Sequence, residues 1–204
     1  MDAKPGPSRD REARDHCGLL ACAVACILSL AAIHCGADGV GSESGERAAD
    51  GPRTRLQQDF RARVDELNQQ TGARQLASGT LREKLARNED IVLLDIREAS
   101  EHRVAALPGA KLVPPSEVES FAGDLPAGAT IVTYCTVGYR SGLAAVTLEK
   151  RIGRPVFNLD GGIIAWFNDG GTVVDAGGEE TDKIDAFSAE WEQYVERKRM
   201  TNDE

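Results

Sequence analysis

The sequence predicts an α/β fold, a three-layer sandwich in which a small, mostly parallel sheet is covered by helices on both faces. From about residue 76 onward, apolar strand-like runs alternate with helix-like segments. The run at 91–94 is continuously apolar rather than alternating, which is typical of a buried strand in a parallel sheet. Gly153 and Gly170 stand where predicted helices should end. The 204 residues fit one such domain with appendages.

The N-terminal segment, residues 1–35, is predicted to be a signal or membrane anchor. Residues 17–33 carry no charge, and their number lies near the lower limit for a membrane span and above that of most signal-peptide cores. A buried core helix is the alternative, but the polar linker that follows argues against it. We therefore expect an exported protein of the periplasm or cell envelope. Whether the segment is cleaved, lipidated or retained as a tether stays open.

The cysteines fall into two groups. Cys17, Cys22, Cys26 and Cys35 lie in or just after the apolar run, whereas Cys135 stands alone in the globular part. The first group lacks the paired short spacings of a zinc site, and charged ligands are disfavoured inside an apolar helix. Its location also argues against a disulfide framework. We expect no metal and no other cofactor.

A linker and a helix precede the domain. Residues 36–52 are rich in Gly, Ser and acidic side chains, which is typical of a flexible linker. Residues 53–71 are predicted to form an amphipathic helix, because apolar residues recur at helical spacing. We expect it to pack on the domain at residues 72–172, although a partner could bind it instead. The apolar positions are Leu56, Phe60, Val64 and Leu67.

Each element of the domain has a local signal. Thr80 with Glu83, and Ser116 with Glu119, have the spacing of capping boxes and predict two helix starts. In the C-terminal tail, residues 173–204, a last helix carrying Trp191 is expected to pack on the body. Apolar runs predict strands at 91–94, 111–113, 130–134 and 155–159, and helices are predicted at 140–151, 161–168 and 188–197.

The net charge of −9 excludes some partners. Residues 1–35 hold equal numbers of acidic and basic side chains, so the excess negative charge lies beyond them. An acidic body repels nucleic acid, and we expect no such partner. A small anionic substrate would need local positive potential. We expect a monomer whose contact with the membrane is made by the N-terminal segment.

The stretch from Ile131 to Gly142 carries the chemistry. An apolar strand runs into Cys135, a short loop follows, and a helix begins near Arg140. Such a loop can aim backbone N–H groups at the sulfur, and the helix N-terminus adds partial positive charge. Gly138 supplies backbone freedom, and Arg140, expected near the surface, adds a full charge. These effects favour a thiolate or persulfide anion at Cys135; an inert buried cysteine is the alternative.

No histidine is placed to act as a base for this cysteine. His16 and His34 lie in the N-terminal segment, and His102 is expected at the surface. A cysteine–histidine hydrolase is therefore disfavoured, and the loop itself must activate the nucleophile.

Four motifs, in this order along residues 76–172, resemble the rhodanese family. L-L-D-I-R-E at 93–98 and L-P-G-A at 107–110 resemble a strand and a turn of that family. C-x4-R, with Cys135 and Arg140, is similar to its active-site loop. N-L-D-G-G at 158–162, with Trp166, resembles its closing strand and helix. The chain departs from the pattern at Ala105-Ala106, where the family usually has Gly-His.

The resemblance implies a rhodanese-type sulfurtransferase. Cys135 takes a sulfane sulfur from a small anionic donor such as thiosulfate, and a thiol or cyanide-like acceptor removes it. Arg140 binds the donor or orients the loop. The segment at 185–187, with Trp191 and Tyr194, resembles a family tail in which aromatics pack back on the body. The resemblance places around the substrate Thr136, Val137, Gly138, Tyr139 and Ser141, with Asp95 and Arg97. For Asp95 and Arg97 a structural ion pair is an equally good interpretation. For Tyr139 a position at the surface, without contact to the substrate, is equally good.

Other functions remain open. A Cys-dependent phosphatase or arsenate reductase of the same fold would use the same Cys–loop–Arg arrangement. In the resemblance, phosphatases place five residues between Cys and Arg, whereas four lie between Cys135 and Arg140. A shorter loop suits one sulfur better than a phosphate. A non-catalytic rhodanese-like binding module and a redox role are the remaining alternatives.

Overall fold

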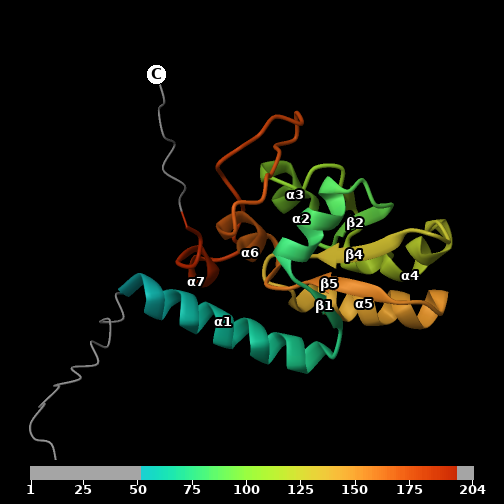
Figure 1. Ribbon diagram of the computed structural model, residues 1–204, viewed down its shortest axis with the longest axis horizontal. Coiled ribbons are helices and arrows are strands. Elements are labelled where there is room, and N and C mark those ends of the chain that lie inside the picture. The colour runs from blue at the N-terminus through green and yellow to red at the C-terminus, as the bar shows by residue number, and fades with distance from the viewer. Residues whose placement is uncertain (1–51, 197–204) are drawn as a thin grey trace, which may run out of the picture. The chain divides into compact units, whose positions relative to one another are not determined.

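The computed structural model describes residues 52–196, in which a five-stranded parallel sheet has the order β1-β5-β4-β2-β3 (Figure 1). Helices lie on both faces, so the predicted three-layer α/β fold is confirmed. The predicted signal segment and most of the linker, residues 1–51, lie outside the described residues, as does the end of the tail. The strands are β1 Arg74–Leu76, β2 Ile91–Asp95, β3 Lys111–Leu112, β4 Thr130–Tyr134 and β5 Val156–Leu159.

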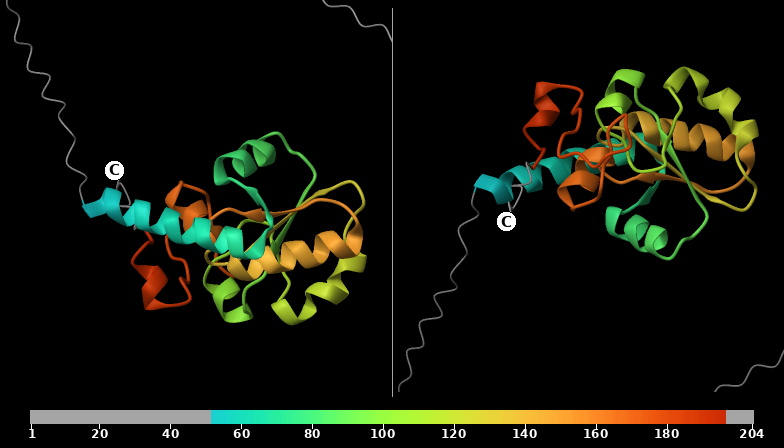
Figure 2. Two further views of the ribbon diagram at one scale, coloured as in Figure 1. Left: turned by 90° about the horizontal axis from the view of Figure 1, so that it is seen from below. Right: turned by 90° about the horizontal axis from the view of Figure 1, so that it is seen from above.

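Alternate side chains of the central strands enter two apolar cores, one on each face of the sheet. Leu93 and Val132 pack in the core that includes residues of α2 and α6. Leu94 and Ile131 pack in the core that includes residues of α4 and α5. Figure 2 shows α2 and α5 on opposite faces. The helices are α1 Pro52–Thr71, α2 Ser78–Ala86, α3 Ala99–Val104, α4 Val118–Phe121, α5 Tyr139–Ile152, α6 Gly162–Asn168 and α7 Ala189–Glu192.

Both predicted capping boxes are wrong. Thr80 lies inside α2, which follows Ala77 without a side-chain cap. Ser116 lies in a 3₁₀ turn, Pro115–Glu117, that precedes α4. The strand β1 and the helix α3 were not predicted from the sequence, because elements of three and six residues are too short to establish a periodicity.

The helix α1 and the tail meet beside the domain. Phe60 of α1 packs against Tyr194 with ring centroids 5.3 Å apart, and the Tyr194 hydroxyl donates to Asp59. The same apolar cluster contains Val137 of the cysteine loop and Ala186 of the tail. The segments that precede and follow the sheet domain in the sequence therefore both support the loop after Cys135. Among the helices of residues 52–196, none combines the length and apolar character needed to cross a membrane.

The carboxyl ends of the parallel strands lie at one edge of the sheet. Asp95 ends β2 and pairs in register with Tyr134, which ends β4. Cys135 follows directly, so residues from both strands converge there. In parallel α/β sheets this edge is where ligands bind.

Candidate active site

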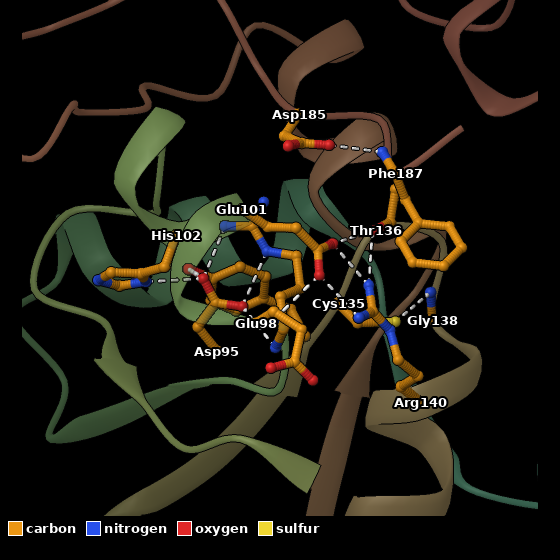
Figure 3. Close-up of polar contacts among 12 residues, drawn as sticks. Asp95, Glu98, Glu101, His102, Cys135, Thr136, Gly138, Arg140, Asp185 and Phe187 are labelled. Carbon is orange, nitrogen blue, oxygen red and sulfur yellow. Dashed lines mark hydrogen bonds and ion pairs between the residues drawn. The ribbon is translucent and has the colours of Figure 1, made fainter. Parts of the chain in front are cut away.

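Cys135 lies directly after β4, and 1% of its surface is exposed. Its sulfur accepts a hydrogen bond from the backbone N–H of Gly138 at 3.2 Å (Figure 3). Gly138 has φ of +100°, a conformation that favours glycine, and immediately precedes α5. The loop therefore directs one backbone donor and the start of a 14-residue helix toward the sulfur.

Gly162 lets α6 support this loop from behind. It has φ of +60°, and a Cβ at this position would lie 2.4 Å from the Cys135 carbonyl oxygen. The N–H groups of Ile163 and Ile164 donate to the carbonyls of Cys135 and Thr136 at 2.9 and 3.3 Å. The N–H donors of α6 are thus used to fix the loop, which the sequence analysis did not foresee.

Arg140 is held by a carboxylate that the sequence analysis missed, Glu101 of α3. The guanidinium donates from Nη1 and Nη2 to the two carboxylate oxygens at 2.8 and 2.7 Å. Nη2 also donates to Thr136 Oγ1 at 3.0 Å, and this hydroxyl donates to Glu101 at 3.1 Å. The exposed fractions of the two side chains are 24% for Arg140 and 6% for Glu101. Arg140, expected near the surface, is partly exposed, and its guanidinium is bidentately paired.

Both members of this pair have shifted pKa values. Burial opposes the positive charge of Arg140, but the hydrogen bond to Glu101 and attraction to Cys135 and Glu101 raise its pKa above the usual value. Burial likewise opposes the charge of Glu101, but the hydrogen bond from Arg140 outweighs it and lowers the pKa of that carboxyl. Both groups are therefore charged at neutral pH.

Glu101→Gln is expected to make the free energy of unfolding fall less steeply as the pH is lowered. A carboxyl whose folded-state pKa is lowered stabilises the fold above its unfolded pKa of about 4.3, and this contribution is lost as pH falls through the folded-state pKa. The variant should be less stable than wild type at neutral pH but should lose less stability on acidification. Denaturant unfolding at several pH values between about 7 and 3 measures the difference.

The matched control for this experiment is Glu117→Gln, which changes an exposed glutamate. It should follow the wild-type pH dependence. If Glu101→Gln follows it too, the Arg140–Glu101 pair does not stabilise the fold through its charge.

Asp95 and Arg97 form a buried ion pair beneath the loop. Arg97 Nη2 lies 2.6 Å from Asp95 Oδ2, and neither side chain has any exposed surface. Arg97 also donates to the carbonyl oxygen of Ala105 at 2.6 Å. The predicted substrate-binding role is therefore not supported, because neither group can reach a donor; the structural ion pair is favoured.

The same carboxylate organises two further side chains. Tyr134 donates its hydroxyl to Asp95 Oδ2 at 2.9 Å, and His102 Nδ1 lies 2.8 Å from that oxygen. Burial raises the pKa of the Tyr134 hydroxyl far above its usual value, so Tyr134 remains a donor. His102, expected at the surface, is half-buried through this contact and keeps part of its side chain exposed.

The other predicted substrate residues lie at different depths. Ser141 is buried and donates to Asn158 Oδ1 at 2.6 Å, so its hydroxyl supports the loop rather than a substrate. Val137 is buried against the tail, whereas the side chain of Tyr139 is exposed. Within residues 52–196, no cluster of His, Cys, Asp and Glu is arranged to hold a metal ion.

Comparison with known proteins identifies a rhodanese-like domain at residues 79–169. A sulfurtransferase of Allochromatium vinosum is 36% identical over 101 residues, which are 49% of this chain and 94% of that protein. The probable adenylyltransferase/sulfurtransferase MoeZ of Mycobacterium tuberculosis is 35% identical over 42% of this chain, and the match covers 22% of MoeZ. A crystal structure of a thiosulfate sulfurtransferase from Pseudomonas aeruginosa is 23% identical, with a TM-score of 0.49, over 67% of this chain and 26% of that one.

Proposed function

The chain belongs to the rhodanese family, and we propose that it is a sulfurtransferase that carries a sulfane sulfur as a persulfide on Cys135. The observation that carries this proposal is the bond from the Gly138 N–H to the Cys135 sulfur, at the carboxyl end of the central strand. A backbone donor there stabilises negative charge on the thiolate and on the persulfide formed from it. Arg140 adds a positive charge that is attracted to the sulfur.

The reaction has two halves. In the first, the Cys135 thiolate attacks the sulfane sulfur of a donor such as thiosulfate; the new S–S bond forms as the donor S–S bond breaks, and sulfite leaves with the electron pair. In the second, a thiolate or cyanide attacks the outer sulfur and regenerates the Cys135 thiolate. No other oxidant or reductant is consumed. The N–H of Gly138 donates to the Cys135 sulfur, which carries the thiolate charge before the first half and after the second.

We further propose that the protein is exported and acts outside the cytoplasm as a monomer. The uncharged run at 17–33, followed by a polar linker, supports export. Recovery of the full-length chain with an intact N-terminus entirely in the soluble cytoplasm would contradict it.

The function is tested by loading the full chain with thiosulfate and measuring its intact mass. We expect an increase equal to one sulfur atom, and peptide mapping should place that sulfur on Cys135 rather than on the four N-terminal cysteines. Cyanide or a thiol should then remove it. Hydrolysis of an aryl phosphate without a sulfur adduct would instead support a phosphatase. The absence of both reactions would support a binding module.

A further inference from the structure

Phe187, in the tail, lies against the Arg140 guanidinium. The guanidinium carbon lies 4.9 Å from the centroid of the phenyl ring, within the range of a cation–π contact. In Figure 3 the Phe187 ring and the Cys135 sulfur lie close to this same guanidinium. Phe187 lies outside residues 79–169, so it belongs to a segment that the rhodanese-like match does not include.

Phe187 combines an exposed side chain with a backbone conformation that is rare for residues other than glycine. Its surface is 64% exposed, whereas Tyr194 of the same tail packs in a buried cluster, as the resemblance implied. The φ of Phe187 is +67°, and Ser188 N–H donates across it to the Ala186 carbonyl at 2.7 Å, which makes Phe187 the centre of a strained γ-turn. The Phe187 N–H also donates to Asp185 Oδ1 at 2.7 Å.

The turn is anchored to the cysteine loop. Ala186 is buried in the same apolar cluster as Val137, the second residue after Cys135, and Tyr194 fixes this cluster to α1. Strained backbone persists only where the surrounding structure imposes it. Here the surroundings impose a conformation that places an exposed aromatic ring at the guanidinium.

The charge around Cys135 disfavours a dianionic donor. Two nitrogens of Arg140 are paired with Glu101, which is nearly inaccessible to solvent, so this buried carboxylate offsets much of the positive charge that a dianion would meet. The aromatic face of Phe187 carries partial negative charge and lies against the guanidinium. The body as a whole is acidic, which adds unfavourable long-range potential.

We propose that Phe187 is a specificity-determining residue that selects organic hydropersulfides bearing an apolar or aromatic group over inorganic dianions such as thiosulfate. The proposal rests on the sulfurtransferase function, and names its preferred donor class. The Cys135 thiolate attacks the outer sulfur of R–S–SH, the S–S bond of the donor breaks, and R–S⁻ leaves while Cys135 becomes the hydropersulfide. The R group packs against the exposed ring of Phe187.

The test compares the rates at which two donors, benzyl hydropersulfide and thiosulfate, add sulfur to Cys135 in the full chain. Each variant rate is divided by the wild-type rate for the same donor, so the intrinsic reactivity of the donor cancels. Phe187→Ala should lower loading by benzyl hydropersulfide roughly 5- to 30-fold, the size expected for losing one aromatic contact, and should leave thiosulfate loading equal or faster. Phe187→Tyr, which keeps the ring, should retain the wild-type rates.

Two further variants serve as controls for this comparison. Phe187→Gly removes the ring and also relieves the positive-φ strain, so it should reproduce the Phe187→Ala result in a chain at least as stable. Leu143→Ala removes an exposed apolar side chain one turn from Tyr139 on α5 and should change neither rate more than about twofold.

The outcomes separate this inference from the function on which it rests. If Phe187→Ala and Phe187→Gly keep the wild-type ratio of the two loading rates, the role of Phe187 is overturned while the sulfurtransferase function stands. If Leu143→Ala shifts the ratio as much as Phe187→Ala does, the effect is not specific to Phe187 and the inference also fails. If the wild-type chain accepts sulfur from neither donor, the proposed function fails and this inference with it.

Discussion

Cys135→Ser is expected to abolish sulfur loading, with a loss of at least about 1,000-fold, or roughly 4 kcal/mol of transition-state stabilisation. Oxygen cannot carry the sulfane sulfur as a persulfide does, and a hydroxyl is too weak an acid for a single backbone donor and a paired arginine to ionise it. The measurement is the intact mass of the full chain after incubation with thiosulfate or with an organic hydropersulfide.

The fold should tolerate this change. Serine is close to cysteine in size, and its oxygen can accept the hydrogen bond that the Gly138 N–H now gives to sulfur. We expect the free energy of unfolding to change by no more than about 1 kcal/mol. The variant keeps Cys17, Cys22, Cys26 and Cys35, so it also shows how much sulfur these thiols take up. Undiminished loading of the variant would remove Cys135 from the mechanism.

Arg97→Ala is expected to lower the free energy of unfolding by about 3–5 kcal/mol, because it leaves the Asp95 carboxylate buried without its cation. For a domain of this size that corresponds to a fall in Tm of roughly 6–20 °C. The carbonyl of Ala105 would also lose the donor that now lies 2.6 Å away. Thermal and denaturant unfolding of the full chain measure the effect.

An arginine on the adjoining helix provides the control. Arg103 of α3 is exposed, and Arg103→Ala should change stability by less than about 0.5 kcal/mol. If Arg97→Ala is as stable as Arg103→Ala but loads sulfur much more slowly, Arg97 acts on the substrate and the assignment of a structural ion pair is wrong.

The sequence by itself determined the features that depend on residues close to one another along the chain. The continuously apolar runs around Leu93 and Val132 identified buried parallel strands, because burial on both faces leaves no polar alternation. The order of strand, Cys135, short loop and helix identified the candidate nucleophile, since the glycine at 138 and the helix start lie within a few residues of it. Such signals are local, so they can be read before the chain is folded.

Short elements and the first residues of helices could not be predicted reliably from the sequence. The strand β1 and the helix α3 span too few residues to show a period, and the spacing at Thr80 and Ser116 matched a capping box although neither residue begins its helix. A three-residue spacing between a hydroxyl and a carboxylate recurs often in a charged chain. Only the backbone conformation decides whether the two side chains meet the free N–H groups.

Only the tertiary structure decided how the site around Cys135 is charged. Arg140 and Glu101 lie on different helices, and their pairing depends on the register that brings β2 beside β4. The contact of Phe187 with Arg140 depends on a tail that is held by α1 through Tyr194. Chain segments far apart in sequence carry no local signal of their contact, because the free energy that joins them comes from packing and charge pairing that exist only once the domain has folded.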